Sequence, residues 1–168
     1  MNGASKRMSG KFPDYGTFQL VALVSLRMLI GWHFLYEGLT KLINPDWSSV
    51  GFLLDSQGAF SELFESMASN PGLLRFIDFL NIWGLIAIGL GLMLGVLARY
   101  AIAGGMALLL LYYFSHPPMV GLKFSAPSEG SYLWVNKNLI EVFALWVLYM
   151  FPTSGIVGLD RFIWKLRK

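Results

Sequence analysis

The chain has 168 residues, of which 55% are hydrophobic and only 14% charged, with a formal net charge of +3 and no Cys. An ordinary soluble domain is about 25% charged, so this composition excludes a typical soluble enzyme and predicts a membrane protein. The aromatic content of 15% excludes a disordered chain. The absence of Cys excludes disulfides, thiolate catalysis and Cys-ligated metal centres.

Four apolar stretches are the main structural signal in the sequence. A helix needs about 20 mostly apolar residues to cross a bilayer core. We expect membrane spans over about 18–42, 78–98, 99–116 and 138–158, within a single membrane domain over 1–168. The spans are predicted to be helices, because open strand edges are not tolerated in lipid. The predicted fold is an all-α membrane protein, a four-transmembrane-helix bundle.

The distribution of basic residues predicts the orientation of this bundle. Lys and Arg in short loops favour the cytoplasmic side of a membrane. On one side lie Lys6, Arg7, Lys11, Arg99, Arg161, Lys165, Arg167 and Lys168, and on the other Lys41, Arg75, Lys123 and Lys137 with most of the acids, such as Glu129. Both termini are therefore predicted to be cytoplasmic, in a multi-pass protein. The basic tails fit contact with anionic lipid and require no nucleic-acid partner.

The first outer loop, about residues 43–74, is long and partly apolar. Phe60, Leu63, Phe64 and Met67 recur at helical spacing, which predicts an amphipathic helix in this loop. Such a helix either forms a lid over a site or shields the end of the bundle, and the sequence leaves both interpretations open.

Ionisable residues inside the predicted spans carry the functional signal. A charge at mid-bilayer costs about 2.5–3.5 kcal/mol, so Arg27, Glu37 and Glu141 each require a structural reason. At 100° per residue, the first span has one polar face lined by small residues. That face comprises Arg27, Gly31, Phe34, Gly38 and Lys41, with Glu37 and His33 on its flank.

Polar residues of all four spans fall in the outer half of the predicted bundle. The first span brings His33, Glu37 and Lys41, and the others bring Asn81, His116, Lys137, Asn138 and Glu141. Convergent polar groups in an apolar bundle predict a binding site. The alternative is structural, because helix ends at a wet interface carry such residues without a ligand, and Arg27 can extend toward the inner surface. Since His33 and His116 fall at different depths, no haem and no metal site are expected.

The first span, Arg27 to Leu42, resembles the DoxX family in its order of Arg, Gly, Phe, Gly and Lys-Leu. Gly84 to Gly95 with Ala98-Arg99 is similar to the Gly-rich second helix of that family. Lys137 to Glu141, followed by Gly158 to Asp160, is similar to its last helix. The resemblance, over about residues 20–160, implies a four-helix protein of the bacterial inner membrane. Some relatives are the membrane subunit of thiosulfate:quinone oxidoreductase, and others work with soluble oxidoreductases.

Three functions remain open on these grounds. The favoured hypothesis is a membrane subunit of a quinone-linked oxidoreductase system, with quinone as the cofactor. In it, Glu37 and Glu141 are the candidate catalytic residues, moving protons, and the candidate ligand-binding residues are Arg27, His33, Lys41, Asn81, His116 and Asn138. The second is a non-catalytic anchor or scaffold for a partner protein, and the third a small-solute carrier. Beyond the lipid bilayer, we expect a protein partner or a homo-oligomer.

Overall fold

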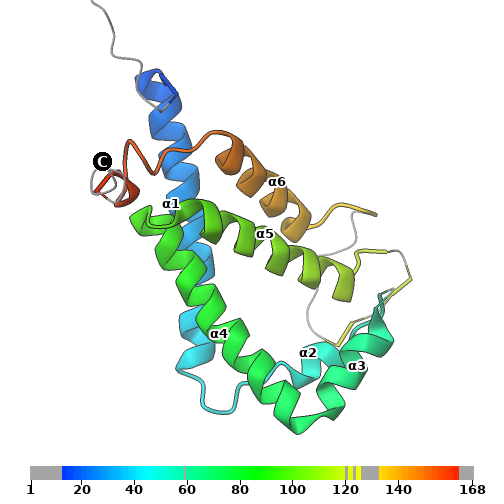
Figure 1. Ribbon diagram of the computed structural model, residues 1–168. Coiled ribbons are helices and arrows are strands. Elements are labelled where there is room, and N and C mark those ends of the chain that lie inside the picture. The colour runs from blue at the N-terminus through cyan, green and yellow to red at the C-terminus, as the bar shows by residue number, and fades with distance from the viewer. Residues whose placement is uncertain (1–12, 59, 120, 123, 126–132, 163–168) are drawn as a thin grey trace, which may run out of the picture.

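The computed structural model describes residues 13–58, 60–119, 121–122, 124–125 and 133–162. In this part of the chain the regular structure is helical, and no β-strand forms. Its helices are α1 (Thr17–Leu42), α2 (Val50–Leu54), α3 (Ser61–Ser69), α4 (Pro71–Leu94), α5 (Ala98–Ser115) and α6 (Lys137–Met150), as Figure 1 shows.

Local side chains explain where several of these helices begin and end. The side-chain oxygen of Asn70 accepts hydrogen bonds from the amides of Gly72 and Leu73, and Pro71 opens α4, so this helix begins well before the predicted span. Asn136 caps α6 in the same way, accepting from the amide of Leu139 at 3.0 Å. Gly95 ends α4 in the left-handed conformation (φ +63°), which glycine adopts without steric strain.

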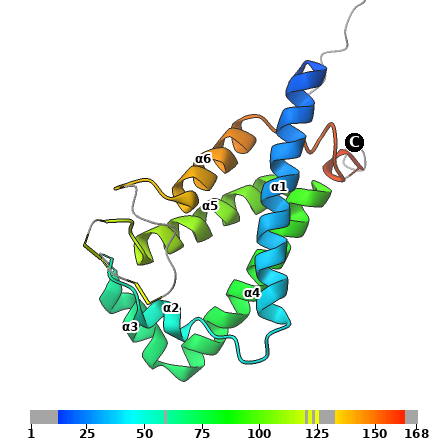
Figure 2. The same cartoon turned by 180° about the vertical axis from the view of Figure 1, so that it is seen from behind.

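The helices pack mainly as two pairs, α1 against α4 and α5 against α6 (Figures 1 and 2). Glycines allow the first pair to approach closely. A Cβ atom at Gly38 would lie 2.7 Å from Cγ1 of Ile86, and one at Gly89 would lie 2.8 Å from the carbonyl oxygen of Gly31. Small residues serve this purpose in membrane helices, because lipid supplies no hydrophobic force between them.

A buried apolar cluster joins the two pairs, with Phe34 of α1, Leu92 of α4 and Leu145 of α6 at its centre. The turn between α4 and α5 is short, as the sequence predicts, but Arg99 lies inside α5 and the turn is formed by Gly95–Leu97. From this turn α4 and α5 diverge, and α2 and α3 lie between their far ends (Figure 1).

Three helices in the described residues, α1, α4 and α5, are long and apolar enough to cross a membrane. Large apolar side chains are exposed on their outer faces, among them Phe18, Trp83 and Tyr100. With 14 residues, α6 is shorter than a full span, so the fourth span stays a prediction. Within residues 43–74, α3 buries Phe64, and the location of this helix at the outer membrane surface also stays a prediction.

Part of the basis for the predicted orientation lies outside the described residues. This applies to Lys6, Arg7, Lys11, Lys123, Glu129, Lys165, Arg167 and Lys168.

Candidate functional site

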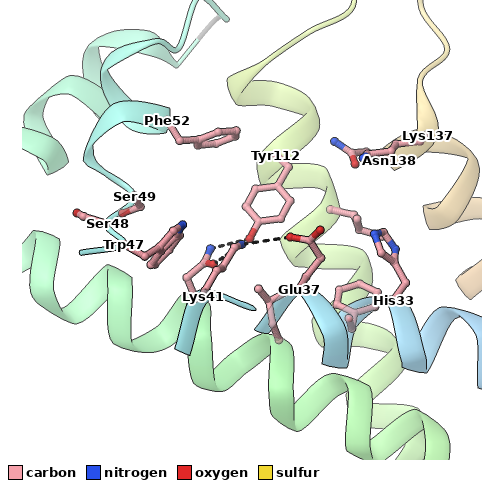
Figure 3. A pocket seen from close by; sticks show the side chains of 14 residues that line it. His33, Glu37, Lys41, Trp47, Ser48, Ser49, Phe52, Tyr112, Lys137 and Asn138 are labelled. Carbon is pink, nitrogen blue, oxygen red and sulfur yellow. Dashed lines mark hydrogen bonds and ion pairs between the residues drawn. The ribbon is translucent and has the colours of Figure 1, made fainter. Parts of the chain in front are cut away.

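A cavity of about 440 Å³ lies between α1, α4, α5, the start of α6 and the segment 47–52 (Figure 3). Its volume falls in the range of about 300–1,000 Å³ that is typical of small-molecule sites. Its polar lining residues are His33, Glu37, Lys41, Ser48, Ser49, Asn81, Tyr112, Lys137 and Asn138, and its apolar ones are Phe34, Trp47, Phe52, Leu85 and Leu109. The cavity therefore combines apolar and aromatic wall surfaces with polar groups from several helices.

A hydrogen-bonded chain of three lining residues joins α1, α4 and α5 at the cavity wall. Nζ of Lys41 donates to Oδ1 of Asn81 at 3.0 Å, and Nδ2 of Asn81 donates to the hydroxyl oxygen of Tyr112 at 2.6 Å. Because the Asn81 amide uses both of its ends, its orientation is fixed. The chain leaves the hydroxyl hydrogen of Tyr112 and further N–H groups of Lys41 available as donors.

Aromatic rings and one carboxylate surround the Lys41 ammonium group. It lies 5.1 Å from the centre of the Trp47 ring and 5.7 Å from that of Tyr112, distances at which cation–π attraction operates. Oε2 of Glu37, one turn earlier on α1, lies 4.0 Å away. Lys41 is 17% exposed and Glu37 47%, so the cation is held inside the cavity while the carboxylate remains accessible.

A second polar pair joins α1 to α6. Nδ1 of His33 lies 2.9 Å and 3.1 Å from the two carboxylate oxygens of Glu141 and donates its hydrogen to them. His33 lines the cavity and Glu141 does not, so the carboxylate holds the imidazole from behind. An ionisable side chain in an apolar membrane helix is costly unless it has a partner, and His33 and Glu141 are partners of each other.

A carboxylate on α4 holds the segment that covers one end of the cavity. Asp78 accepts hydrogen bonds from the hydroxyl of Ser48 and the amide of Ser49, both at 2.8 Å, and from the hydroxyl of Ser49. This anchor places Trp47 beside Lys41, and it places Phe52 edge-on to Tyr112 with their ring centres 5.5 Å apart. The sequence analysis did not predict that the segment 47–52 lines the site. The Ser-Ser pair beside Trp47, in a partly apolar loop, was the feature that could have indicated it.

His116 lies outside the cavity, behind Phe52. Its ring stacks on Phe52 at 4.0 Å and lies 4.6 Å from Phe124, while Nε2 is 3.6 Å from the Asp55 carboxylate. Burial lowers the pKa of His116, and the neighbouring Asp55 opposes this in part. Burial raises the pKa of Asp55, but hydrogen bonds from Ser125 and the nearby His116 outweigh it, so the pKa of Asp55 is lowered. His116 thus supports the cover of the cavity from outside.

Arg27 lies at another place in the fold and contacts the chain after α6. Its guanidinium donates to the hydroxyl of Thr153 at 2.9 Å and to the carbonyl oxygen of Val157 at 2.7 Å, and it is only 3% exposed. Asp160 accepts hydrogen bonds from the amides of Leu97 and Ala98 and so caps α5. These contacts bind the segment after α6 to α1 and to the α4–α5 turn, which gives Arg27 a structural role.

A profile of the DoxX family matches residues 22–117, from within α1 to just past the end of α5, which is more than half of the chain. The chain belongs to the DoxX family. No curated protein and no solved structure matches it. Membership in DoxX, together with the apolar helices, identifies a multi-pass membrane protein.

The sequence-predicted site residues of this DoxX protein separate into two groups. His33, Glu37, Lys41, Asn81 and Asn138 line one cavity. Glu141 stands behind His33, His116 stands behind Phe52, and Arg27 belongs to the contact with the C-terminal segment. In the described part of the chain, no group of three His, Asp or Glu side chains is placed to hold a metal ion. The cavity residues are the ones that can hold an organic ligand.

Proposed function

We propose that this DoxX protein is the membrane subunit of a quinone-linked oxidoreductase system, and that the cavity binds the quinone ring. The observation that carries the proposal is the Lys41–Asn81–Tyr112 chain, which holds two hydrogen-bond donors at an apolar cavity built from several helices. A quinone needs flat apolar walls and donors for its carbonyl oxygens, and both are present.

The cavity residues fit a quinone ring in chemistry and in shape. Leu85 and Leu109 supply apolar wall, and Trp47, Phe52 and Tyr112 supply aromatic surfaces. Lys41 and Tyr112 would both donate to the same carbonyl oxygen of the quinone, because their hydrogen bonds to Asn81 hold them next to each other. Asn138, at the first turn of α6, is an amide on the opposite wall. The proposed ring therefore lies between the α1–α4 pair and the α5–α6 pair.

A bound quinone supplies two-electron chemistry that is coupled to two protons. Glu37 is the proton-transferring residue in this proposal, because it lines the cavity, lies 4.0 Å from Lys41 and is almost half exposed. Glu141 contributes by holding His33 in place. The electrons have to be exchanged with a partner redox protein, which we propose as the second component of the system.

The proposed setting is the bacterial inner membrane, with α6 as the fourth span and both termini in the cytoplasm. In this orientation the cavity lies in the outer half of the bundle, because α1 runs outward from its N-terminus and His33, Glu37 and Lys41 lie in its second half. The amphipathic α3 then lies at the outer membrane surface, beside the cover segment.

A second candidate function, a non-catalytic anchor for a partner protein, has one observation in its favour. Phe60 and Leu63 at the start of α3 are about half exposed, at 49% and 50%, in the first outer loop. Apolar side chains on such a loop can dock a partner. This function predicts recovery of a stoichiometric partner from membranes and no quinone binding.

The test is equilibrium binding of a decyl-substituted benzoquinol to the purified protein. Lys41→Met or Tyr112→Phe should weaken binding about tenfold, which corresponds to about 1.4 kcal/mol for one lost donor. Arg75→Gln, which removes a charge from α4 outside the cavity, is the matched control and should leave binding unchanged. Absence of binding by the unmodified protein, or equal binding by all variants, would reject the proposal.

A further inference from the structure

Packing closes most sides of the cavity in the described part of the chain. Between α1 and α4 the backbones are in close contact at Gly31, Gly38 and Gly89. Between α5 and α6, a Cβ at Gly105 would lie 3.1 Å from the Leu145 side chain. The cover segment closes the end through Asp78. Between α4 and α5, the hydrogen bond from Asn81 to Tyr112 joins the two helices at the cavity. Among the neighbouring helices around the cavity, α1 and α6 share the least contact, so their boundary is the least closed side.

The two helices meet at one end of this boundary and separate toward the other. At the deep end, the Phe34 ring and Leu145 both pack against Gly105, where a Cβ atom would lie 3.3 Å from the ring and 3.1 Å from the leucine. Toward the start of α6, Figures 1 and 2 show α6 leaning away from α1. There, His33 and Glu141 form a hydrogen bond between the two helices. A polar pair therefore bridges the open part of the boundary.

The exposed fractions of the His33 and Glu141 side chains indicate what surrounds the boundary between α1 and α6. The His33 side chain is 41% exposed and lines the cavity, while Glu141 is 12% exposed. Both helices are apolar and present large apolar side chains such as Leu29 and Ile140 on their exposed faces. The partly exposed imidazole therefore belongs both to the lining of the cavity and to the surface of the protein beside these apolar faces. The exterior that fits such a surface is the acyl chains of the bilayer.

We propose that an amphiphile, a polar ring with an apolar tail, enters the cavity directly from the bilayer by passing between α1 and α6. The His33–Glu141 pair lies at this entrance. This inference rests on the proposed quinone function. Side-chain rotation alone parts the imidazole from the carboxylate, so the ring can pass without unpacking a helix. The tail of a bound ligand then lies between α1 and α6 while its ring reaches Lys41.

The absence of Cys from the chain allows a direct test. The double variant H33C/E141C is bridged with a short, reducible, thiol-specific bifunctional reagent, which fixes α1 to α6. Two ligands are compared, a decyl-substituted benzoquinone and the same ring carrying a methyl group in place of the decyl chain. The controls are the double variant after reduction and the single variant H33C treated with the same reagent.

The proposal predicts that bridging slows association of the decyl ligand at least about tenfold and leaves association of the methyl ligand within about twofold. Reduction should restore the association rate of the decyl ligand to that of the untreated double variant. Treatment of the single variant H33C with the reagent should leave its association rates as they were before treatment. Equal association of both ligands with the bridged and reduced proteins would overturn the α1–α6 passage but not the cavity. Failure of every form, including the unmodified protein, to bind either ligand would overturn the proposed function itself.

Discussion

At the scale of single residues, the site depends on which polar groups are shared and which remain available. Asn81 accepts from Lys41 through its carbonyl oxygen and donates to Tyr112 through its amide nitrogen, which fixes the orientation of the amide. Since an amide carries no charge, Asn81 orients the Lys41 cation without neutralising it. The positive charge can then act on an acceptor oxygen in the cavity.

Substituting Asn81 tests this division of roles. Asn81→Asp places a carboxylate against Lys41, which should weaken quinol binding about tenfold while the protein stays folded. Asn81→Leu removes both hydrogen bonds and should lower the free energy of unfolding by about 1–3 kcal/mol. Ligand titration and thermal unfolding in detergent measure the two effects. An Asn81→Asp protein that binds like the unmodified one would show that the Lys41 charge is not used.

Arg27 predicts a contrasting pattern, because it lies in a structural contact. Arg27→Met should lower the free energy of unfolding by about 1–3 kcal/mol, since the hydroxyl of Thr153 and the carbonyl of Val157 lose a charged donor. Arg27→Lys keeps the charge but cannot donate through two nitrogens, so its stability should fall between those of the unmodified protein and Arg27→Met. Thermal unfolding measures stability, and quinol titration of the folded fraction should show unchanged affinity. A loss of affinity without a loss of stability would place Arg27 in the binding site.

The sequence predicted much of this residue-scale arrangement. Helical periodicity placed His33, Glu37 and Lys41 on neighbouring positions of α1, because the geometry of one helix follows from spacing alone. Arg27 and His116 were different, because their partners, such as Thr153 and Phe52, come from distant parts of the chain. No spacing rule brings those segments together, so tertiary packing decided their roles.

At the scale of helices, glycine decides how α1 and α4 approach. Gly89 of α4 faces the backbone of α1, where an added Cβ would lie 2.7 Å from Cβ of Leu35 and 2.8 Å from the carbonyl oxygen of Gly31. Gly84, on the same helix, has no such neighbour within 4 Å. The two glycines therefore have different roles in one helix.

This difference gives a matched pair of variants. Gly89→Ala should lower the free energy of unfolding by about 1–3 kcal/mol, because backbone atoms cannot move aside for a methyl group. Gly84→Ala should leave stability unchanged or raise it slightly, since alanine favours the helix. Thermal unfolding of both proteins in the same detergent decides the matter. Equal effects would mean that α1 and α4 do not pack at Gly89.

The burial of His116, together with the polar contacts of Asp55, predicts a pH dependence at the cover of the cavity. The pKa values of both groups are lowered in the folded protein, so the unfolded chain binds more protons in acid. Stability from His116 is therefore complete above about pH 6.5 and is lost as the pH falls below it, with Asp55 following below about pH 4. His116→Phe, which can keep the stack on Phe52, should reduce the fall in unfolding temperature between pH 7 and pH 5. A fall of the same size in both proteins would contradict this.

At the scale of the whole molecule, two helix pairs diverge and leave a ligand-sized space between them. Hydropathy predicted the long helices, because lipid exposure requires uninterrupted apolar residues. It did not predict the divergence of α4 and α5, which depends on the Gly95–Leu97 turn and on Asp160 capping α5 from beyond α6. The cover over the cavity also depends on contacts between distant segments, such as Asp78 with Ser48.

A structure determined in native lipid is the most direct test of whether the cavity binds a quinone ring with an apolar tail. We expect flat density within hydrogen-bonding distance of Lys41 and Tyr112, continuing as a narrow tail between α1 and α6. A cavity that contains only separate water-sized peaks, with no density between α1 and α6, would contradict the proposed site.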